Sequence, residues 1–272
     1  GLPDLVDFLE ERPHAIIFAG GTYVMGRHRR KYFELDRDVA VITEIEELSR
    51  IHRTERYIEI GAGATISSVL ETGTNVVPTV LIDALRDIGT LPLRNRATLG
   101  GNICVPEMRL NSYPALLLLD AAVELRSKRG SRWIQMNRFA EPDGTLSKQP
   151  GEVCTRIRVP FGDWNIQVFR TLGNGIAAKE WKISFCGAAT TRKRMLADLR
   201  FAFGSMGKTV LRDREIEAEL IGRRLPLSER DRDQAEELLS DSLESRTPAL
   251  SPFQYRMALR FFRWFISIIE LE

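Results

Sequence analysis

The alternation and spacing of hydrophobic residues divide the first part of the chain into short strands and helices. Apolar or alternating runs predict strands at residues 15–18, 39–42, 57–60, 123–126 and 153–159. Apolar positions at helical spacing predict a short helix over residues 5–9 and another from Val80 to Ile88. This half of the chain is therefore expected to mix both kinds of element.

The second part follows a candidate domain boundary at Pro160 to Asp163. Residues 166–169, 183–185 and 199–203 predict an antiparallel sheet, and residues 213–222 and 228–244 predict helices with charged outer faces. Helices on one face of an antiparallel sheet make this half α+β. The last segment carries a stripe at helical spacing, which is more typical of a core or a subunit contact than of a cofactor site: Phe253, Met257, Phe261, Phe265 and Ile269.

The most distinctive stretch runs from Ile88 to Leu119, where a helical segment leads into a polar, glycine-rich loop. Gly100 and Gly101 lack a Cβ, so their backbone can take positive φ and approach an anion closely. Thr98 and Asn102 flank the pair with a hydroxyl and an amide. The alternative is an ordinary loop with two turn glycines. The apolar run from Ala115 to Leu119 is expected to be buried.

A second glycine motif, Ala19-Gly20-Gly21-Thr22, follows the predicted strand at residues 15–18 directly. Successive N–H groups in such a turn can point into one concavity and bind phosphate. Gly21 and Gly26 have the spacing of a P-loop, but Arg27 and His28 stand where lysine and serine or threonine are needed, so nucleotide hydrolysis is disfavoured.

The segment Gly61-Ala62-Gly63 is similar to a dinucleotide fingerprint but lacks its third glycine. Thr65 is better explained as the cap of a short helix that runs through Leu70.

Composition indicates a soluble globular protein with room for two domains, because 43% of the 272 residues are hydrophobic and 28% are charged. The 39 basic and 37 acidic side chains leave a formal charge of +2, which gives no global attraction to nucleic acid or to an anionic membrane. A basic cluster at residues 27–31 is either a contact for nucleic acid or ligand phosphates, or a solvated face. No apolar run is long enough to span a bilayer.

Three cysteines, Cys104, Cys154 and Cys186, are isolated from one another along the chain. An odd, scattered set indicates neither a disulfide framework nor a metal cage. We therefore expect no metal or iron–sulfur site in this chain, and a reducing cytoplasm as its compartment.

Taken together, the motifs resemble the FAD-binding medium subunit of molybdenum hydroxylases, the family of xanthine dehydrogenase and carbon monoxide dehydrogenase. The resemblance rests first on AGGT at residues 19–22 and on RNRATLGGNI at residues 94–103, followed by Asn111 and Pro114. Residues 116–121 resemble the family's L-x-x-L-D-A block, and residues 152–160 resemble its E-x-L-x-x-I-x-I-P strand. Weaker matches continue toward the C-terminus at Phe203-Gly204, residues 217–225 and Tyr255-Arg256.

The resemblance implies an α+β fold with a two-lobed, PCMH-type FAD-binding domain at residues 1–161. Its lobes would be roughly 1–50 and 51–161, and a C-terminal flavoprotein domain would follow at 162–272. It also implies electron transfer through FAD, from an iron–sulfur small subunit and a molybdopterin large subunit to NAD⁺ or another acceptor. No nucleic acid or membrane partner is expected.

Carried over by position, the resemblance implies four groups of FAD contacts. Gly20, Gly21 and Thr22, with Ala19 before them and Tyr23 and Val24 after, would cradle the pyrophosphate through backbone N–H groups. Thr98, Gly101 and Asn102 would form a second wall of the cleft. Ile88 and Cys154 would make apolar or backbone contacts. Asn111 would bind a hydroxyl, and Arg170 stands where a lysine commonly approaches the flavin.

Several positions depart from the family's pattern. Tyr23 replaces an acidic residue, Asn111 replaces an aspartate, Pro106-Glu107-Met108 replaces Ala-Ser-Pro, and Gly175 replaces an arginine. A diverged scaffold subunit with weak or lost flavin binding is therefore the alternative function. The substrate of the complex and its electron acceptor stay undecided.

Overall fold

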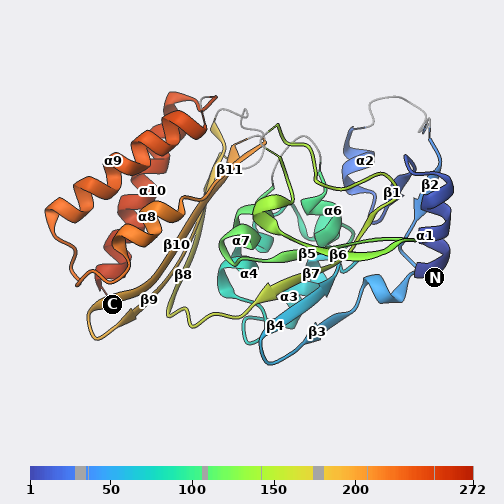
Figure 1. Cartoon of the computed structure of the whole chain (residues 1–272), viewed down its shortest axis with the longest axis horizontal. Coiled ribbons are helices and arrows are strands. Elements are labelled where there is room, and N and C mark those ends of the chain that lie inside the picture. The colour runs from blue at the N-terminus through green and yellow to red at the C-terminus, as the bar shows by residue number, and fades with distance from the viewer. Residues whose placement is uncertain are drawn as a thin grey trace. The chain divides into compact units, whose positions relative to one another are not determined.

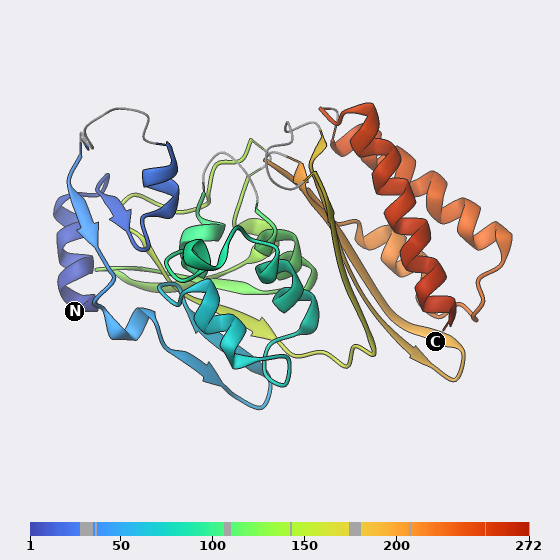
Figure 2. The same cartoon turned by 180° about the vertical axis from the view of Figure 1, so that it is seen from behind.

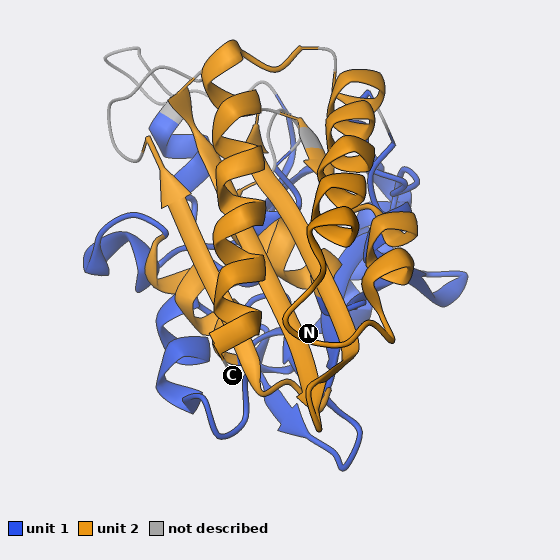
Figure 3. Ribbon diagram, turned by 90° about the vertical axis from the view of Figure 1, so that its left-hand side faces the viewer, with its two compact units in different colours: residues 1–78, 88–106, 119–161 blue, residues 79–87, 107–118, 162–272 orange. Residues whose placement is uncertain are grey.

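The computed structural model describes residues 1–27, 35, 37–105, 110–141, 143–173, 181–206, 208–247 and 249–271. The chain forms two compact units (Figure 3). Unit 1 comprises residues 1–78, 88–106 and 119–161, and unit 2 comprises residues 79–87, 107–118 and 162–272. Two segments from the first half of the sequence thus pack with the C-terminal residues.

Unit 1 is built on a five-stranded antiparallel sheet (Figure 1). Its strand order is β3 (Ile51–Arg53), β4 (Tyr57–Gly61), β7 (Val153–Pro160), β5 (Ala122–Ser127) and β6 (Gly130–Gln135). One face is apolar and fully buried, because Ile58, Ile60, Val123, Leu125 and Ile157 alternate with polar residues along their strands. The polar face carries Glu59, Glu124, Arg156 and Arg158, which are paired with one another.

The N-terminal part of unit 1 adds a small parallel pair, β1 (Ile16–Phe18) and β2 (Val39–Val41). Helix α1 (Leu2–Glu11) packs Leu2, Leu5, Val6 and Leu9 against this pair. The remaining helices of the unit are short: α2 (Thr22–Arg27), η1 (Glu46–Leu48), α3 (Ile66–Thr72), α5 (Leu91–Arg94), α6 (Leu99–Ile103) and η2 (Met136–Arg138).

Unit 2 contains a four-stranded antiparallel sheet in the order β11 (Thr209–Leu211), β10 (Met195–Met206), β9 (Ile183–Arg192) and β8 (Ile166–Leu172). Helices α8 (Arg214–Leu220), α9 (Glu229–Arg246) and α10 (Pro252–Leu271) lie together on one face (Figures 1 and 2). Helices α4 (Thr79–Arg86) and α7 (Ser112–Leu118) pack on the other. The helices that follow the predicted domain boundary thus lie on one face of the sheet, as expected, and α4 and α7, which precede that boundary in sequence, cover the other face.

The core of unit 2 is aromatic. Phe185 packs on Phe203 and Phe265 with ring centroids 5.1 and 5.4 Å apart, and Phe201 packs on Phe262 at 5.1 Å. The predicted stripe on the last helix lies here, with Phe265 and Ile269 buried and Met257 and Phe261 packed against the core. Edge-on and tilted ring pairs of this kind stabilise the fold in addition to the contribution from the apolar area that they bury.

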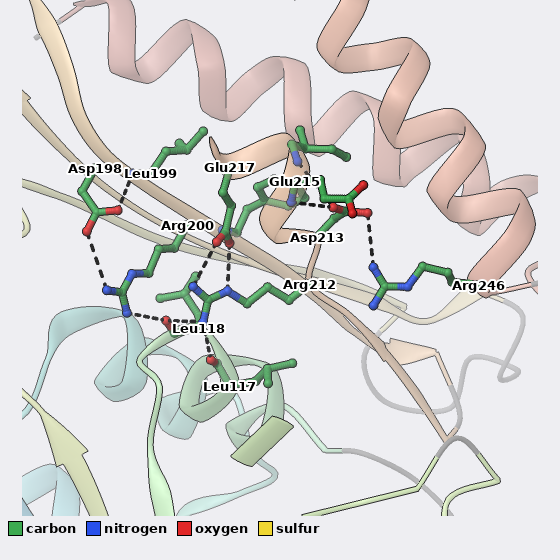
Figure 4. Close-up of polar contacts among 12 residues, drawn as sticks. Leu117, Leu118, Asp198, Leu199, Arg200, Arg212, Asp213, Glu215, Glu217 and Arg246 are labelled. Atoms are coloured by element: carbon green, nitrogen blue, oxygen red, sulfur yellow. Dashed lines mark hydrogen bonds and ion pairs between the residues drawn. The ribbon is translucent and has the colours of Figure 1, made fainter. Parts of the chain in front are cut away.

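The C-terminal end of α7 is held by two arginines (Figure 4). Arg212 donates from Nη1 to the carbonyls of Leu117 and Leu118 at 2.9 and 3.2 Å, and Arg200 donates to Leu118 at 3.3 Å. Arg212 also pairs with the buried carboxylate of Glu217 at 2.8 and 3.0 Å. Burial outweighs this pairing and raises the pKa of Glu217. The last carbonyls of a helix lack intrahelical donors, so this cluster satisfies them.

Most predicted elements are confirmed, including the cap at Thr65, whose Oγ1 accepts from the Ser68 amide at 3.1 Å. The predicted glycine-rich loop at residues 99–103 is wrong, because these residues form α6. Strands β3, β6 and β11 were not predicted. Among the described residues, no helix is both long enough and apolar enough to cross a bilayer.

Candidate functional site

The AGGT motif forms a tight turn between β1 and α2 in unit 1. Gly21 has φ +70°, and a Cβ at this position would lie 2.4 Å from the ring of Phe18. Both facts require glycine, since L side chains rarely adopt this conformation. The Gly21 carbonyl accepts from the Met25 amide at 2.9 Å, so helix α2 starts directly from the turn.

Three successive backbone N–H groups in this turn are available to a ligand. Within the part of the chain that the structure describes, the amides of Gly20, Gly21 and Thr22 have no acceptor. Backbone donors are almost always satisfied in native proteins, by the protein, by water or by a ligand. Consecutive amides at a turn of this kind suit the oxygens of a phosphate group.

The turn lies directly against the second motif. A Cβ on Gly20 would fall 1.6 Å from the carbonyl oxygen of Arg96, which is closer than any side chain allows. Arg96 in turn donates from Nε to the Gly20 carbonyl at 3.4 Å, across 76 residues of sequence. The exposed Arg96 guanidinium therefore contacts the Gly20 carbonyl of the same turn, and its charge adds to the attraction of an anion.

The second motif is a capped helix in which every early amide is used by the protein. The amides of Leu99 and Gly100 donate to the carbonyls of Ala64 and Ala62 at 3.0 and 2.9 Å. The amides of Gly101 and Asn102 donate to the hydroxyl and carbonyl of Thr98 at 3.0 and 2.9 Å.

The expectation that Gly100 and Gly101 offer free amides at positive φ is therefore wrong. Neither residue has positive φ, because Thr98 caps a helical turn. Gly100 is needed instead for close packing, since a Cβ there would lie 2.5 Å from that of Ala62.

The other predicted site residues of unit 1 lie around these two segments. Thr98 and Asn102 are buried, with 6% and 8% of their surface exposed. Tyr23, Val24 and Ile88 are half-buried, and the Ile88 carbonyl accepts from Arg94 at 3.3 Å. Their contact with a cofactor stays a prediction.

Two predicted residues, Asn111 and Arg170, belong to unit 2 and have partners there. Asn111 donates from Nδ2 to Asp87 at 2.5 Å and accepts from the Ser205 hydroxyl. Arg170 stacks over the ring of Trp264 at 4.8 Å and donates to the Phe169 carbonyl at 3.0 Å. Each side chain is thus held inside its own unit.

Several sequence positions fall outside the described residues. These are residues 28–31 of the basic cluster, the departures Pro106, Glu107 and Met108, and Gly175. For Arg27, the structure gives the backbone as the end of α2.

Sequence reasoning missed Arg96 and the pairing of two cysteines. Arg96 lies two residues before Thr98 in the RNRATLGGNI segment. A basic residue so close to a glycine motif could have indicated a cation near the candidate anion site. Cys104 and Cys154 are far apart in sequence, but the thiol of Cys154 is hydrogen-bonded to that of Cys104. The two cysteines are isolated along the chain, and the packing of α6 on β7 brings them together in the fold.

A polar pocket of about 370 Å³ lies elsewhere in unit 1, on the charged face of the sheet. Its most buried acid, Glu124, accepts from Thr155 at 2.6 Å and from Arg156 at 2.7 Å. Burial acts to raise the pKa of Glu124, but these hydrogen bonds outweigh it and the pKa lies below its ordinary value. Glu124 is therefore held as a paired carboxylate in the wall of this pocket.

The chain resembles a known protein family and known proteins over more than half of its length. The family described as FAD binding domain in molybdopterin dehydrogenase matches residues 2–162. The xanthine dehydrogenase FAD-binding subunit of Escherichia coli O157:H7 is 30% identical over 164 residues, which is 58% of this chain and 55% of that protein. The match thus spans a little over half of that relative.

Two further similarities extend over more of the chain. The glyceraldehyde dehydrogenase medium chain of Sulfolobus acidocaldarius is 25% identical over 227 residues, covering 82% of this chain and 79% of that protein. A structure of CO dehydrogenase from Oligotropha carboxidovorans has the same fold, with a TM-score of 0.81 at 19% identity over 96% of this chain and 92% of that one. The chain belongs to the family of FAD-binding domains of molybdopterin dehydrogenases.

Proposed function

We propose that this chain is the FAD-carrying electron-transfer subunit of a molybdenum hydroxylase complex. The observation that supports it most is the AGGT turn, where the amides of Gly20, Gly21 and Thr22 have no acceptor among the described residues and Arg96 lies alongside. Three backbone donors and one cation at the same turn suit a diphosphate, which carries negative charge and only acceptor oxygens.

In this proposal, each part of unit 1 has a separate task. The three amides and Arg96 hold the pyrophosphate, with Ala19, Tyr23 and Val24 shaping the turn. The Thr98 hydroxyl accepts from the Gly101 amide and keeps its own proton to donate, and Asn102 lies one helical turn along. Bound FAD supplies the redox chemistry, while the protein positions and orients it.

The remaining assignments rest on family position. Ile88 and Cys154 would make apolar or backbone contacts to the cofactor. In unit 2, Asn111 and Arg170 stay predicted contacts, although their side chains already have partners within that unit. The domain limits 1–161 and 162–272 likewise stay predictions.

We further propose that electrons reach this subunit from iron–sulfur clusters of a small subunit, after a molybdopterin subunit oxidises the substrate. NAD⁺ or another acceptor would then receive them. Relatives named as an FAD-binding subunit and as a medium chain support a role as one subunit of several.

A second candidate is a scaffold subunit of the same fold with weak flavin binding. It is favoured by the second motif, whose amides from Leu99 to Asn102 already have protein acceptors, and by the absence of an acid at Tyr23 and Asn111. Such a chain would assemble with its partners and carry no flavin.

The test is the visible spectrum of the purified chain, recorded alone, after addition of FAD, and after denaturation. The proposal expects a flavin band, released as free FAD on denaturation, and quenching of FAD fluorescence on titration. A colourless protein that does not quench added FAD contradicts it. Copurification with iron–sulfur and molybdenum subunits in that colourless state would support the scaffold.

A further inference from the structure

The packing of α6 on the sheet of unit 1 brings two cysteines together. The Cys104 amide donates to the Gly100 carbonyl at 3.1 Å, so the two residues lie one helical turn apart on the same face. That face packs closely against Ala62, because a Cβ added to Gly100 would lie 2.5 Å from the Cβ of Ala62. Ala62 donates to the carbonyl of Thr155 at 2.9 Å, next to Cys154 on β7. Cys104 therefore faces β7 at Cys154.

The two thiols differ in their surroundings. Cys154 is 7% exposed, whereas Cys104 is half-buried at the C-terminal end of α6. The hydrogen bond to Cys104, followed by burial, raises the pKa of Cys154 well above its ordinary value. A thiol with a raised pKa keeps its proton, and Cys104 is the more exposed member of the pair. Cys186 is fully buried on β9 in unit 2 and serves as an internal reference.

We propose that Cys104 and Cys154 form a peroxide-sensitive thiol pair that closes reversibly to a disulfide within the chain. Helix α6, whose C-cap residue is Cys104, packs on strand β7, which carries Cys154, and the Ala62 amide beside Gly100 donates to the carbonyl next to Cys154. Disulfide closure requires the Cβ atoms to come about 3.5–4.5 Å apart. A half-buried thiol beside a resolving thiol is the arrangement that favours reversible oxidation.

The oxidant is a hydroperoxide, and the step balances as follows. Cys104 sulfur attacks one oxygen of hydrogen peroxide, which gives the Cys104 sulfenic acid and one water. Cys154 sulfur then attacks the Cys104 sulfur, and the hydroxyl group leaves with the Cys154 proton as a second water. Two thiols lose two electrons and two protons to the peroxide, and a dithiol reductant reverses the reaction.

The bond would fix the C-terminal end of α6 to β7. Thr98 caps the N-terminal end of the same five-residue helix, and Gly101 and Asn102 lie within it. Formation of the disulfide is therefore expected to change the affinity for FAD. This expectation rests on the proposed function, whereas the formation of the disulfide itself is independent of it.

The test treats the full chain with equimolar hydrogen peroxide, then counts free thiols under denaturing conditions and maps peptides without reduction. The wild type should fall from three free thiols to one, with a peptide pair joining Cys104 to Cys154 at a mass lower by two hydrogens. A dithiol should restore all three. The Cys186→Ser control should lose both of its remaining thiols in the same way, while Cys104→Ser and Cys154→Ser should form no link.

Three results would overturn the proposal: three thiols persisting after peroxide, Cys104 accumulating as a sulfinic acid without a link, or the link joining two copies of the chain. The wild-type peptide map does not depend on whether a variant folds. FAD titration of the linked and reduced chain is read separately. A link that forms in a chain without FAD affinity would keep this inference and reject only the proposed function.

Discussion

The missing Cβ at position 20 is what allows the two glycine motifs to meet. The Arg96 carbonyl occupies the space that any side chain at Gly20 would need. By contrast, Gly26 has open space around its Cα in the exposed part of α2. Replacement by alanine is therefore expected to change the free energy of unfolding in opposite directions at the two glycines.

Gly20→Ala should lower the free energy of unfolding by about 1–3 kcal/mol or more, because backbone atoms must move to admit the methyl group. Gly26→Ala should leave stability unchanged or raise it by up to about 1 kcal/mol, since alanine favours a helix over glycine. Urea unfolding of both variants beside the wild type measures this. Equal stability of the two variants would show that Gly20 does not lie against Arg96.

Arg96 brings a side-chain cation to the turn, where its Nε donates to the Gly20 carbonyl. Arg96→Gln should weaken FAD binding by about tenfold, in line with the loss of one charge-assisted hydrogen bond. The wild type should also lose more affinity than the variant when salt is added. Arg129→Gln, in the exposed turn before β6, is the matched control and should bind FAD as the wild type does. An Arg96→Gln variant with unchanged affinity would remove Arg96 from the site.

At the scale of elements, helix α8 is fixed by its first carboxylate. Asp213 caps α8 by accepting from the Glu215 and Ile216 amides at 3.0 and 3.4 Å. It also accepts from Ser242 at 2.6 Å and Arg246 at 3.2 Å on α9. Burial acts to raise the pKa of Asp213, but the hydrogen bonds and the Arg246 charge outweigh it and the pKa is lowered.

Asp213→Asn should lower the free energy of unfolding by about 1–2 kcal/mol at pH 7. Because the folded pKa lies below the ordinary value of 3.8, the carboxylate stabilises the fold above that pH. The difference between wild type and variant should therefore shrink as the pH falls below 3.8. Urea unfolding at neutral and acidic pH measures both values, and a difference that grows on acidification would contradict the assigned sign.

The elements that sequence patterns missed share a physical cause. Strands β3, β6 and β11 all lie at sheet edges, where pairing on one side supplies the order and little burial is needed. Their residues, such as Ile51-His52-Arg53, therefore show a weak pattern. Helices α2, α5 and α6 have four to six residues and depend on caps and tertiary contacts, which single-sequence propensity does not register.

The candidate site likewise has one part that the sequence predicts and other parts that it does not. The AGGT turn was predictable as a turn, because glycines directly after a strand allow the positive φ that Gly21 adopts. The role of Gly100 was not, since close packing on Ala62 and a free amide look identical in sequence. The Cys104–Cys154 pair was hidden because nothing in the sequence brings α6 onto β7.

At the scale of the whole molecule, the chain passes between its two units more than once. Helices α4 and α7 belong to unit 2, although both precede residue 161 in sequence. A single boundary read from the sequence places both in the first domain. The buried pair Arg212–Glu217, which holds the end of α7, shows what anchors one of these segments in unit 2.

FAD binding should be coupled to the stability of the folded chain. Free FAD at 100 times its dissociation constant should raise the free energy of unfolding by about 2.7 kcal/mol, if it binds only the folded state. Thermal unfolding with and without FAD measures this shift. Riboflavin, which lacks the pyrophosphate, should give a much smaller shift, and an equal one would exclude the turn as the main anchor.

The central claim is that the amides of the AGGT turn hold a diphosphate, and fluorescence titration of Thr22→Asp with FAD tests it most directly. An aspartate here adds a negative charge beside the phosphates while favouring the start of helix α2. Thr79→Asp places the same residue at the start of α4 and is the matched control. We predict at least about tenfold weaker FAD binding for Thr22→Asp, with wild-type stability and unchanged binding in Thr79→Asp. Equal FAD affinity in Thr22→Asp, Thr79→Asp and the wild type would contradict the account.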